Sequence, residues 1–163
     1  MYAQLFTPNR QSSIAQVKKF SFQILIIWGV SAISLRLFAI LSPDILTAEA
    51  EAVGSGSPLV TWLFALLISP IVETLILAYS IIIAKQIYKK RATALALAPV
   101  PICLLHVFTY WQLSILVYPS FLIQGIIYDN SSNVYGTRKS LFYVAMLHMV
   151  CNTITLTLDK LTG

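Results

Sequence analysis

The 163-residue sequence is 58% hydrophobic and only 10% charged, with a mean hydropathy of +0.80 and a net charge of +5. Soluble domains average about 45–50% apolar and about 25% charged residues, and a chain of this length cannot bury so large an apolar excess. These values exclude a water-soluble globule and a disordered tail, and a content of two cysteines excludes a disulfide scaffold. We therefore expect an integral membrane protein that folds as one helix bundle.

The chain divides into apolar segments of about the length that a membrane span requires, which is about 20 residues. The segments follow a polar tail at residues 1–19 and are separated by an acidic loop at 43–57, a basic junction after 84, a tight turn near Trp111 and a polar loop at 129–140. In chain order, the predicted spans are residues 20–42, 58–84, 92–110, 113–128 and 141–158. The sequence thus predicts an all-α polytopic bundle of about five spans, with residues 1–19 as a cytoplasmic tail and 20–163 as a single transmembrane domain.

The positive charges are distributed as membrane topology requires. With the N-terminus in the cytoplasm, nearly all bases outside the spans lie in cytoplasmic segments, and Lys160 alone lies in an outer segment. The cytoplasmic bases are Arg10, Lys18, Lys19, Lys85, Lys89, Lys90, Arg91, Arg138 and Lys139. The basic excess is therefore explained by topology, and we expect membrane lipid and no nucleic acid as a partner.

Polar side chains within the spans indicate a functional site, because ionisable groups at membrane depth are costly. Glu73, His106, His148 and Asn152 come from three predicted helices and lie between roughly 14 and 22 Å from the cytoplasmic bases, at about 1.5 Å per residue. Ser69 shares the face of Glu73, and Pro70 should free backbone carbonyls that other groups must satisfy. Taken singly, each polar residue can be a hydrogen-bonded packing residue. Their convergence at one depth predicts a site.

These side-chain types fit the hydrolysis of an amide bond by an activated water. A Glu paired with a His can deprotonate water, and a second His with an Asn amide can donate to an oxyanion. Two His and one Glu are also proper zinc ligands, so zinc stays open, although the sequence has no HExxH motif. Cys103 and Cys151 lie one helical turn from His106 and His148, where small apolar packing residues are expected more often than ligands.

The sequence resembles the CPBP group of intramembrane proteases, also called the Abi or CAAX-protease family. Three family motifs, EExxxR, FxxxH and HxxxN, are similar to SPIVETLILA at residues 69–78, ICLLH at 102–106 and HMVCN at 148–152. The segment from FLIQGIIYDN to the final helix is similar as well, so the resemblance covers about residues 58–158.

The resemblance implies a glutamate-dependent intramembrane endopeptidase that needs no cofactor, although members were first called metalloproteases. Glu73 would be the catalytic carboxylate, His106 its partner in activating water, and His148 and Asn152 the oxyanion hole. The substrate would be a protein or peptide with a membrane-associated C-terminal segment. The short chain resembles bacterial members, which implies a multi-pass protein of a bacterial inner membrane.

The first motif departs from the family pattern at two positions. Thr74 stands where the family has a second Glu, and Ala78 stands where it has an Arg. The loss of both charges together avoids an unpaired buried ion. Arg36 either replaces the lost cation or extends its side chain to the membrane–water interface. These departures keep a second hypothesis open, a non-catalytic immunity factor or scaffold that retains the fold. A proton relay or small transporter is the third.

Overall fold

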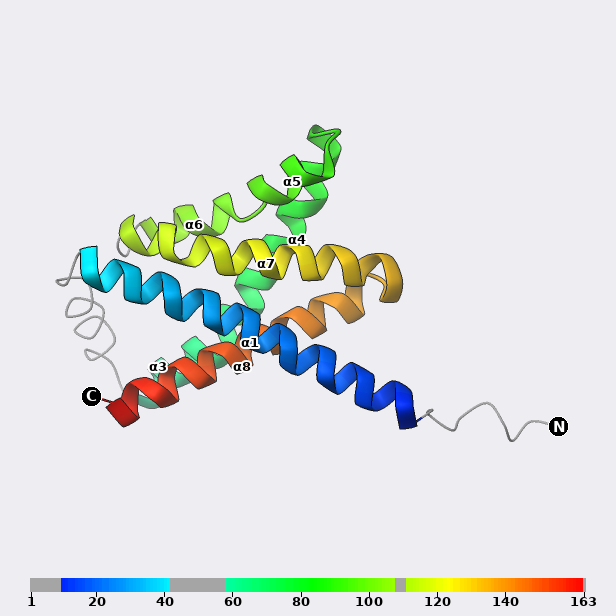
Figure 1. The fold of residues 1–163 in the computed structure, drawn as a ribbon. Coiled ribbons are helices and arrows are strands. Elements are labelled where there is room, and N and C mark those ends of the chain that lie inside the picture. Colours follow the sequence, from blue (N-terminus) through cyan, green and yellow to red (C-terminus); the bar gives the residue numbers. More distant parts are fainter. Residues whose placement is uncertain (1–9, 42–57, 108–110, 163) are drawn as a thin grey trace.

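The protein is all-helical over the residues that the computed structural model describes, which are 10–41, 58–107 and 111–162. The helices are α1 (Arg10–Leu41), α3 (Pro58–Leu63), the π-helix η1 (Phe64–Ile68), α4 (Ser69–Ile87), α5 (Arg91–Leu97), α6 (Val100–Val107), α7 (Trp111–Tyr135) and α8 (Thr137–Thr162) (Figure 1). The acidic loop predicted at residues 43–57 lies outside the described residues.

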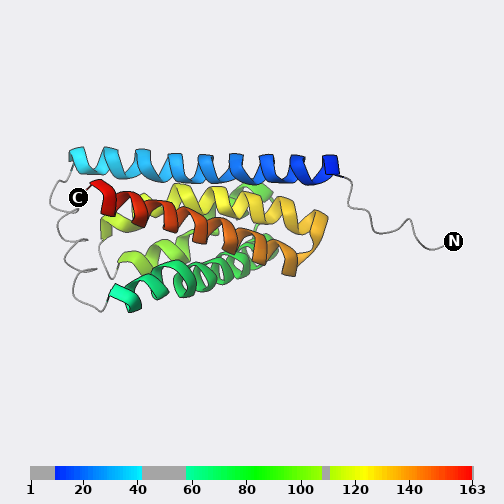
Figure 2. The ribbon, with the colours of Figure 1, turned by 90° about the horizontal axis from the view of Figure 1, so that it is seen from below.

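The core lies where α1, α4, α6, α7 and α8 meet. It contains Ile27 of α1, Leu77 and Ile81 of α4, Ile102 of α6 and Leu147 of α8, each no more than 1% exposed. Helix α1 packs along one side against α7 and α8, and α4 crosses below them (Figure 2). Large apolar side chains such as Phe22, Tyr79 and Phe142 remain exposed on the outer helix faces.

Two continuous helical stretches are long and apolar enough to cross a membrane, Phe64–Ile87 and Thr137–Thr157. Together with the exposed apolar faces, which a water-soluble monomer rarely presents over so wide a surface, these stretches indicate an association with the membrane. The first stretch overlaps the predicted span 58–84 at residues 64–84, and the second contains most of the predicted span 141–158.

The helix boundaries differ from the sequence expectations at three places. Helix α1 begins at Arg10, within the predicted polar tail, because the sequence before residue 20 contains good helix formers such as Ala15, Gln16 and Lys18. The third predicted span, 92–110, is interrupted between α5 and α6. Pro99 and Pro101 cause this break, because neither has an N–H to donate to the preceding turn. Residues 108–110 lie outside the described residues.

The third correction concerns the polar loop predicted at residues 129–140, most of which is helical. Helix α7 continues to Tyr135 and α8 begins at Thr137. The hydroxyls of Ser131 and Ser132 donate to carbonyls of their own helix, those of Tyr128 and Asp129. Polar side chains that are satisfied in this way do not interrupt a helix, so the turn between the two helices is confined to Gly136.

Gly136 adopts a positive φ of 80°, the left-handed conformation that commonly ends a helix. We expect Gly136→Ala to lower the free energy of unfolding by about 1 kcal/mol, because a Cβ clashes in this conformation. Thermal unfolding in detergent, followed by circular dichroism, measures the change. Gly29→Ala is the matched control, since Gly29 lies within α1 and an added Cβ meets no atom within 4 Å. An equal loss in both variants would contradict the assignment.

Candidate functional site

Glu73 lies between two histidines that come from other helices. Its Oε1 is 3.8 Å from Nε2 of His106 on α6, and its Oε2 is 3.5 Å from Nε2 of His148 on α8. The side chain of Glu73 is only 16% exposed. The predicted convergence of these three residues is therefore confirmed, with each carboxylate oxygen facing one imidazole.

Ser69 orients the carboxylate of Glu73. Its hydroxyl, one turn earlier on α4, donates to Oε1 of Glu73 at 2.5 Å. Short distances of this kind are typical of a hydroxyl that donates to a carboxylate. The expectation that Ser69 shares the face of Glu73 is thus confirmed, and the hydrogen bond restricts the carboxylate to one orientation between the imidazoles.

The two imidazoles are held differently. Nδ1 of His106 lies 2.9 Å from the carbonyl oxygen of Ile102, and because a carbonyl only accepts, this nitrogen carries the hydrogen. The other ring nitrogen, Nε2, faces Glu73. His148 is 6% exposed, and its Nδ1 has no hydrogen-bond partner among the described residues.

Phe121 of α7 contacts both histidines, which the sequence did not indicate. Its ring centroid is 5.4 Å from that of His148, in an edge-on arrangement, and 6.3 Å from that of His106. Phe121 is 3% exposed, so it packs a buried apolar ring against the two imidazoles that face the carboxylate. The sequence offered no signal for this role, since an aromatic residue in an apolar helix is ordinary.

Asn152 lies one turn beyond His148 on α8 and binds the backbone of η1. Its Nδ2 donates to the carbonyl oxygen of Ala65 at 2.9 Å. In this π-helix the N–H of Ser69 bonds to Phe64, and Pro70 has no N–H, so the usual backbone donors to the Ala65 carbonyl are missing. The expectation that Pro70 frees a carbonyl near the site is confirmed, and Asn152 is the group that satisfies it.

We expect Asn152→Leu to lower the free energy of unfolding by about 0.6–1.7 kcal/mol, the range for polar contacts between membrane helices. The reason is that the Ala65 carbonyl would lose its donor in an apolar region. Thr153→Val is the control, because its exposed hydroxyl only donates to Met149 of its own helix. Thermal unfolding in detergent compares the two, and equal effects would contradict the assigned role.

The two positions that depart from the family motif are packed in the core. Thr74 is 2% and Ala78 is 3% exposed, and Oγ1 of Thr74 has no hydrogen-bond partner among the described residues. Arg36 is exposed. In the part of the chain that the structure describes, the groups within ion-pair distance of Glu73 are the two histidines, so Arg36 does not replace the cation.

Cys103 and Cys151 are free and buried. The Sγ of Cys151 lies 4.0 Å from the carbonyl oxygen of Ile24, and Cys151 belongs to the hydrophobic core. Across residues 10–41, 58–107 and 111–162, no group of three or more His, Cys, Asp and Glu side chains has an arrangement that could hold a metal ion.

A second charged cluster, absent from the sequence expectations, joins α4 and α5 to α7. Asp129 is 1% exposed, Lys85 donates to its Oδ1, and Nε of Arg91 donates to its Oδ2 at 2.7 Å. Burial alone would raise the pKa of Asp129, but the hydrogen bonds and charges of Lys85 and Arg91 outweigh it and hold the pKa below its ordinary value. These residues had been interpreted only as loop and topology markers, since the partners are about 40 positions apart.

No family model matches the chain, and no curated protein and no solved structure matches it.

Proposed function

We propose that the protein is an intramembrane endopeptidase of the CPBP type, with Glu73 as the general base. The observation that carries the proposal is the position of the Glu73 carboxylate between the Nε2 atoms of His106 and His148. Acid–base groups of this kind are expected at a hydrolytic site, and the motif resemblance supplies the reaction class.

In the proposed reaction, a water molecule is held between Glu73 and His106. Their separation of 3.8 Å exceeds a direct hydrogen bond, and a water that bonds both groups fits such a spacing. Glu73 takes a proton from this water while the oxygen attacks the carbonyl carbon of the scissile peptide bond. The tetrahedral intermediate then collapses, Glu73 passes the proton to the leaving nitrogen, and a carboxylic acid and an amine are released.

His148 and Asn152 are the proposed donors to the oxyanion. In His148 the nitrogen that faces the site is Nε2, so Nε2–H would be the donor. One amide hydrogen of Asn152 bonds to Ala65, which leaves the second for the oxyanion. Donors already fixed by packing lose little freedom during the reaction, which is how such sites gain rate.

We further propose five membrane crossings with a cytoplasmic N-terminus, α5 and α6 together forming the broken third crossing. The N-terminal end of α1, the α4–α5 connection and the α7–α8 turn lie toward one end of the bundle (Figures 1 and 2). These segments carry the bases at residues 18–19, 85–91 and 138–139, and the positive-inside rule favours the cytoplasm for that end. By the resemblance, the membrane is a bacterial inner membrane and the substrate a protein or peptide with a membrane-associated C-terminal segment.

A survey of protein termini in membranes tests the proposal. Membranes from cells with the wild-type chain, Glu73→Gln or His106→Ala, at matched protein levels, are compared by mass spectrometry of terminal peptides. We expect new termini with the wild type only, and their sequences would identify substrate and cleavage position. Identical profiles for all three proteins would refute the peptidase function.

One observation favours a second function, a non-catalytic scaffold or immunity factor. The core positions that carry charges in the family are occupied by Thr74 and Ala78, and no acid or base beside them on α4 supports Glu73. The scaffold hypothesis predicts that Glu73→Gln keeps the biological effect of the wild type in full, whereas the peptidase hypothesis predicts its loss.

A further inference from the structure

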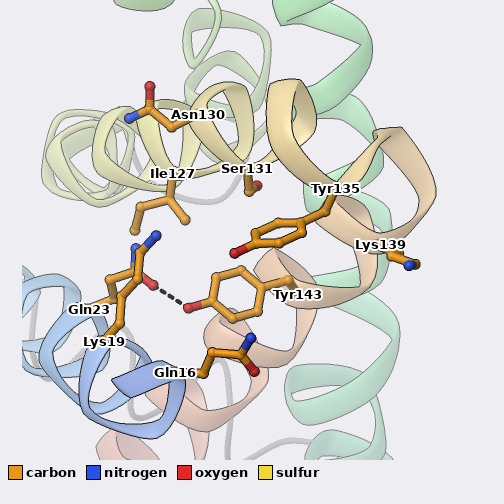
Figure 3. A pocket seen from close by; sticks show the side chains of 9 residues that line it. All are labelled: Gln16, Lys19, Gln23, Ile127, Asn130, Ser131, Tyr135, Lys139 and Tyr143. Atoms are coloured by element: carbon orange, nitrogen blue, oxygen red, sulfur yellow. Dashed lines mark hydrogen bonds between the residues drawn. The ribbon is translucent and has the colours of Figure 1, made fainter. Parts of the chain in front are cut away.

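A cavity of about 350 Å³ opens between α1, α7 and α8, with Lys19 and Lys139 in its lining (Figure 3). Its lining residues come from all three helices, and Ile127 is the one aliphatic side chain among them. They are Gln16, Lys19, Gln23, Ile127, Asn130, Ser131, Tyr135, Lys139 and Tyr143. The cavity contains no part of the Glu73 site.

The lining favours an anion. It includes two lysines and no carboxylate, and among the described residues neither lysine forms an ion pair with an acid. The acid that lies next in sequence to a lining residue is Asp129, beside Asn130, and it is already paired with Lys85 and Arg91. The positive charge of the cavity is therefore not neutralised by the part of the protein that the structure describes.

Hydrogen bonds within the lining leave donors available. The hydroxyl of Tyr143 donates to Oε1 of Gln23, which occupies the acceptor of that amide and leaves its NH₂ group as a donor. In Figure 3, Lys19 and Gln23 of α1 face the hydroxyls of Tyr135 and Tyr143. Ammonium, amide and phenol donors that converge in this way match the oxygens of a phosphate.

Exposed apolar side chains lie close in sequence to lining residues on α1 and α8. Phe22 and Leu25 of α1 are 63% and 64% exposed, and Phe142 of α8, next to Tyr143, is 69% exposed. A ligand with a phosphate in the cavity and hydrocarbon chains along these residues would contact hydrogen-bond donors with its phosphate and apolar side chains with its hydrocarbon. Basic pockets between membrane helices bind lipid headgroups in the same manner.

We propose that this cavity binds the phosphate headgroup of an anionic phospholipid. The inference rests on the membrane placement proposed above and is independent of the peptidase activity. Lys19, the Gln23 amide and the Tyr135 hydroxyl bind the phosphate, Lys139 adds positive charge at the opposite edge of the cavity, and the acyl chains lie against α1 and α8.

Native mass spectrometry of the full chain in detergent tests the proposal. Phosphatidylglycerol and phosphatidylcholine with identical acyl chains are added separately, and we expect one phosphatidylglycerol to be retained more tightly than phosphatidylcholine. Lys19→Gln combined with Lys139→Gln should weaken phosphatidylglycerol binding by about 25-fold, from about fivefold for each lysine. Lys89→Gln combined with Lys90→Gln removes the same charge from exposed positions outside the cavity and should change binding less than twofold.

A second variant and a soluble anion distinguish the remaining explanations. Gln16→Trp keeps the charge but fills the cavity, and it should reduce phosphatidylglycerol retention as well. Equal losses in the two double variants, or full retention in Gln16→Trp with its fold intact by circular dichroism, would overturn the assignment. Binding of inorganic phosphate alone, at the affinity of the lipid and with the same dependence on Lys19 and Lys139, would also overturn a lipid site.

Discussion

Glu73→Gln should lower the rate of peptide-bond cleavage by about 10²–10⁴-fold, the range for loss of a general acid or base. Gln is nearly isosteric and can still accept the hydrogen bond from Ser69, so packing around the site should change little. It cannot take a proton from water, however. The rate is measured in proteoliposomes with a peptide that spans the cleavage position found in the survey of termini.

Tyr79→Phe is the matched control for this variant. Tyr79 lies on α4, is 67% exposed and points away from the core, so its substitution tests general disturbance of the helix. We expect the control to cleave at the wild-type rate. Glu73→Gln that cleaved as fast as the control would rule out Glu73 as the base, whereas an absence of cleavage by both the wild type and the control would favour the scaffold hypothesis.

Asp129→Asn should lower the free energy of unfolding by about 2–3 kcal/mol, the upper part of the range for hydrogen bonds to charged groups. The carboxylate is 1% exposed and accepts from both Lys85 and Arg91, and Asn has one acceptor oxygen and an NH₂ group that would face a cation. The loss stays below that of a fully buried ion pair, because Lys85 and Arg91 are 37% and 55% exposed and can be hydrated. Thermal and chemical unfolding in detergent provide the measurement.

We expect the effect of Asp129→Asn on the free energy of unfolding to depend on pH. The pKa of Asp129 is lowered in the folded protein. The ionised carboxylate therefore contributes fully to the free energy of unfolding at pH values above the pKa of an Asp in the unfolded chain, about 3.9. It is lost as the pH falls below that value and through the folded pKa. The stability difference between wild type and Asp129→Asn should therefore be constant from pH 8 to 6 and shrink below about pH 4.

Asn130→Ala is the control for the cluster. Its Oδ1 accepts from Arg91 in an exposed position, so its removal should cost less than about 0.5 kcal/mol.

A difference between wild type and Asp129→Asn that did not change with pH would mean that the charge of Asp129 contributes nothing to stability.

Much of the general architecture followed from the sequence. The apolar composition and the segment lengths predicted an all-helical, membrane-associated protein, because hydrocarbon leaves backbone groups no partner outside the segment. The positions of Glu73, His106 and His148 along their helices also predicted that they meet, since each lies at a similar distance from the basic end. The roles of these residues in catalysis remain predictions that the variants above test.

Helix boundaries were predicted less well, for a local reason. The polar stretch after Tyr128 was expected to be a loop, yet it is helical to Tyr135. The end of an apolar segment predicts where the chain leaves an apolar environment. It does not predict where the helix ends, because polar residues can extend the helix when their side chains have hydrogen-bond partners. Ser131 finds a backbone carbonyl of its own helix, and Asp129 finds two cations on other segments.

By itself, the sequence determined the helical fold class and the set of polar residues within the apolar segments, because both depend on composition and on distance along the chain. Only the tertiary structure decided which groups meet. It brought Phe121 against both histidines, directed Asn152 to the Ala65 carbonyl, and formed an open cavity with two lysines in its lining between α1, α7 and α8. These contacts depend on the rotation and crossing of helices about their axes, which packing of the whole bundle sets and which periodicity in a uniformly apolar helix does not encode.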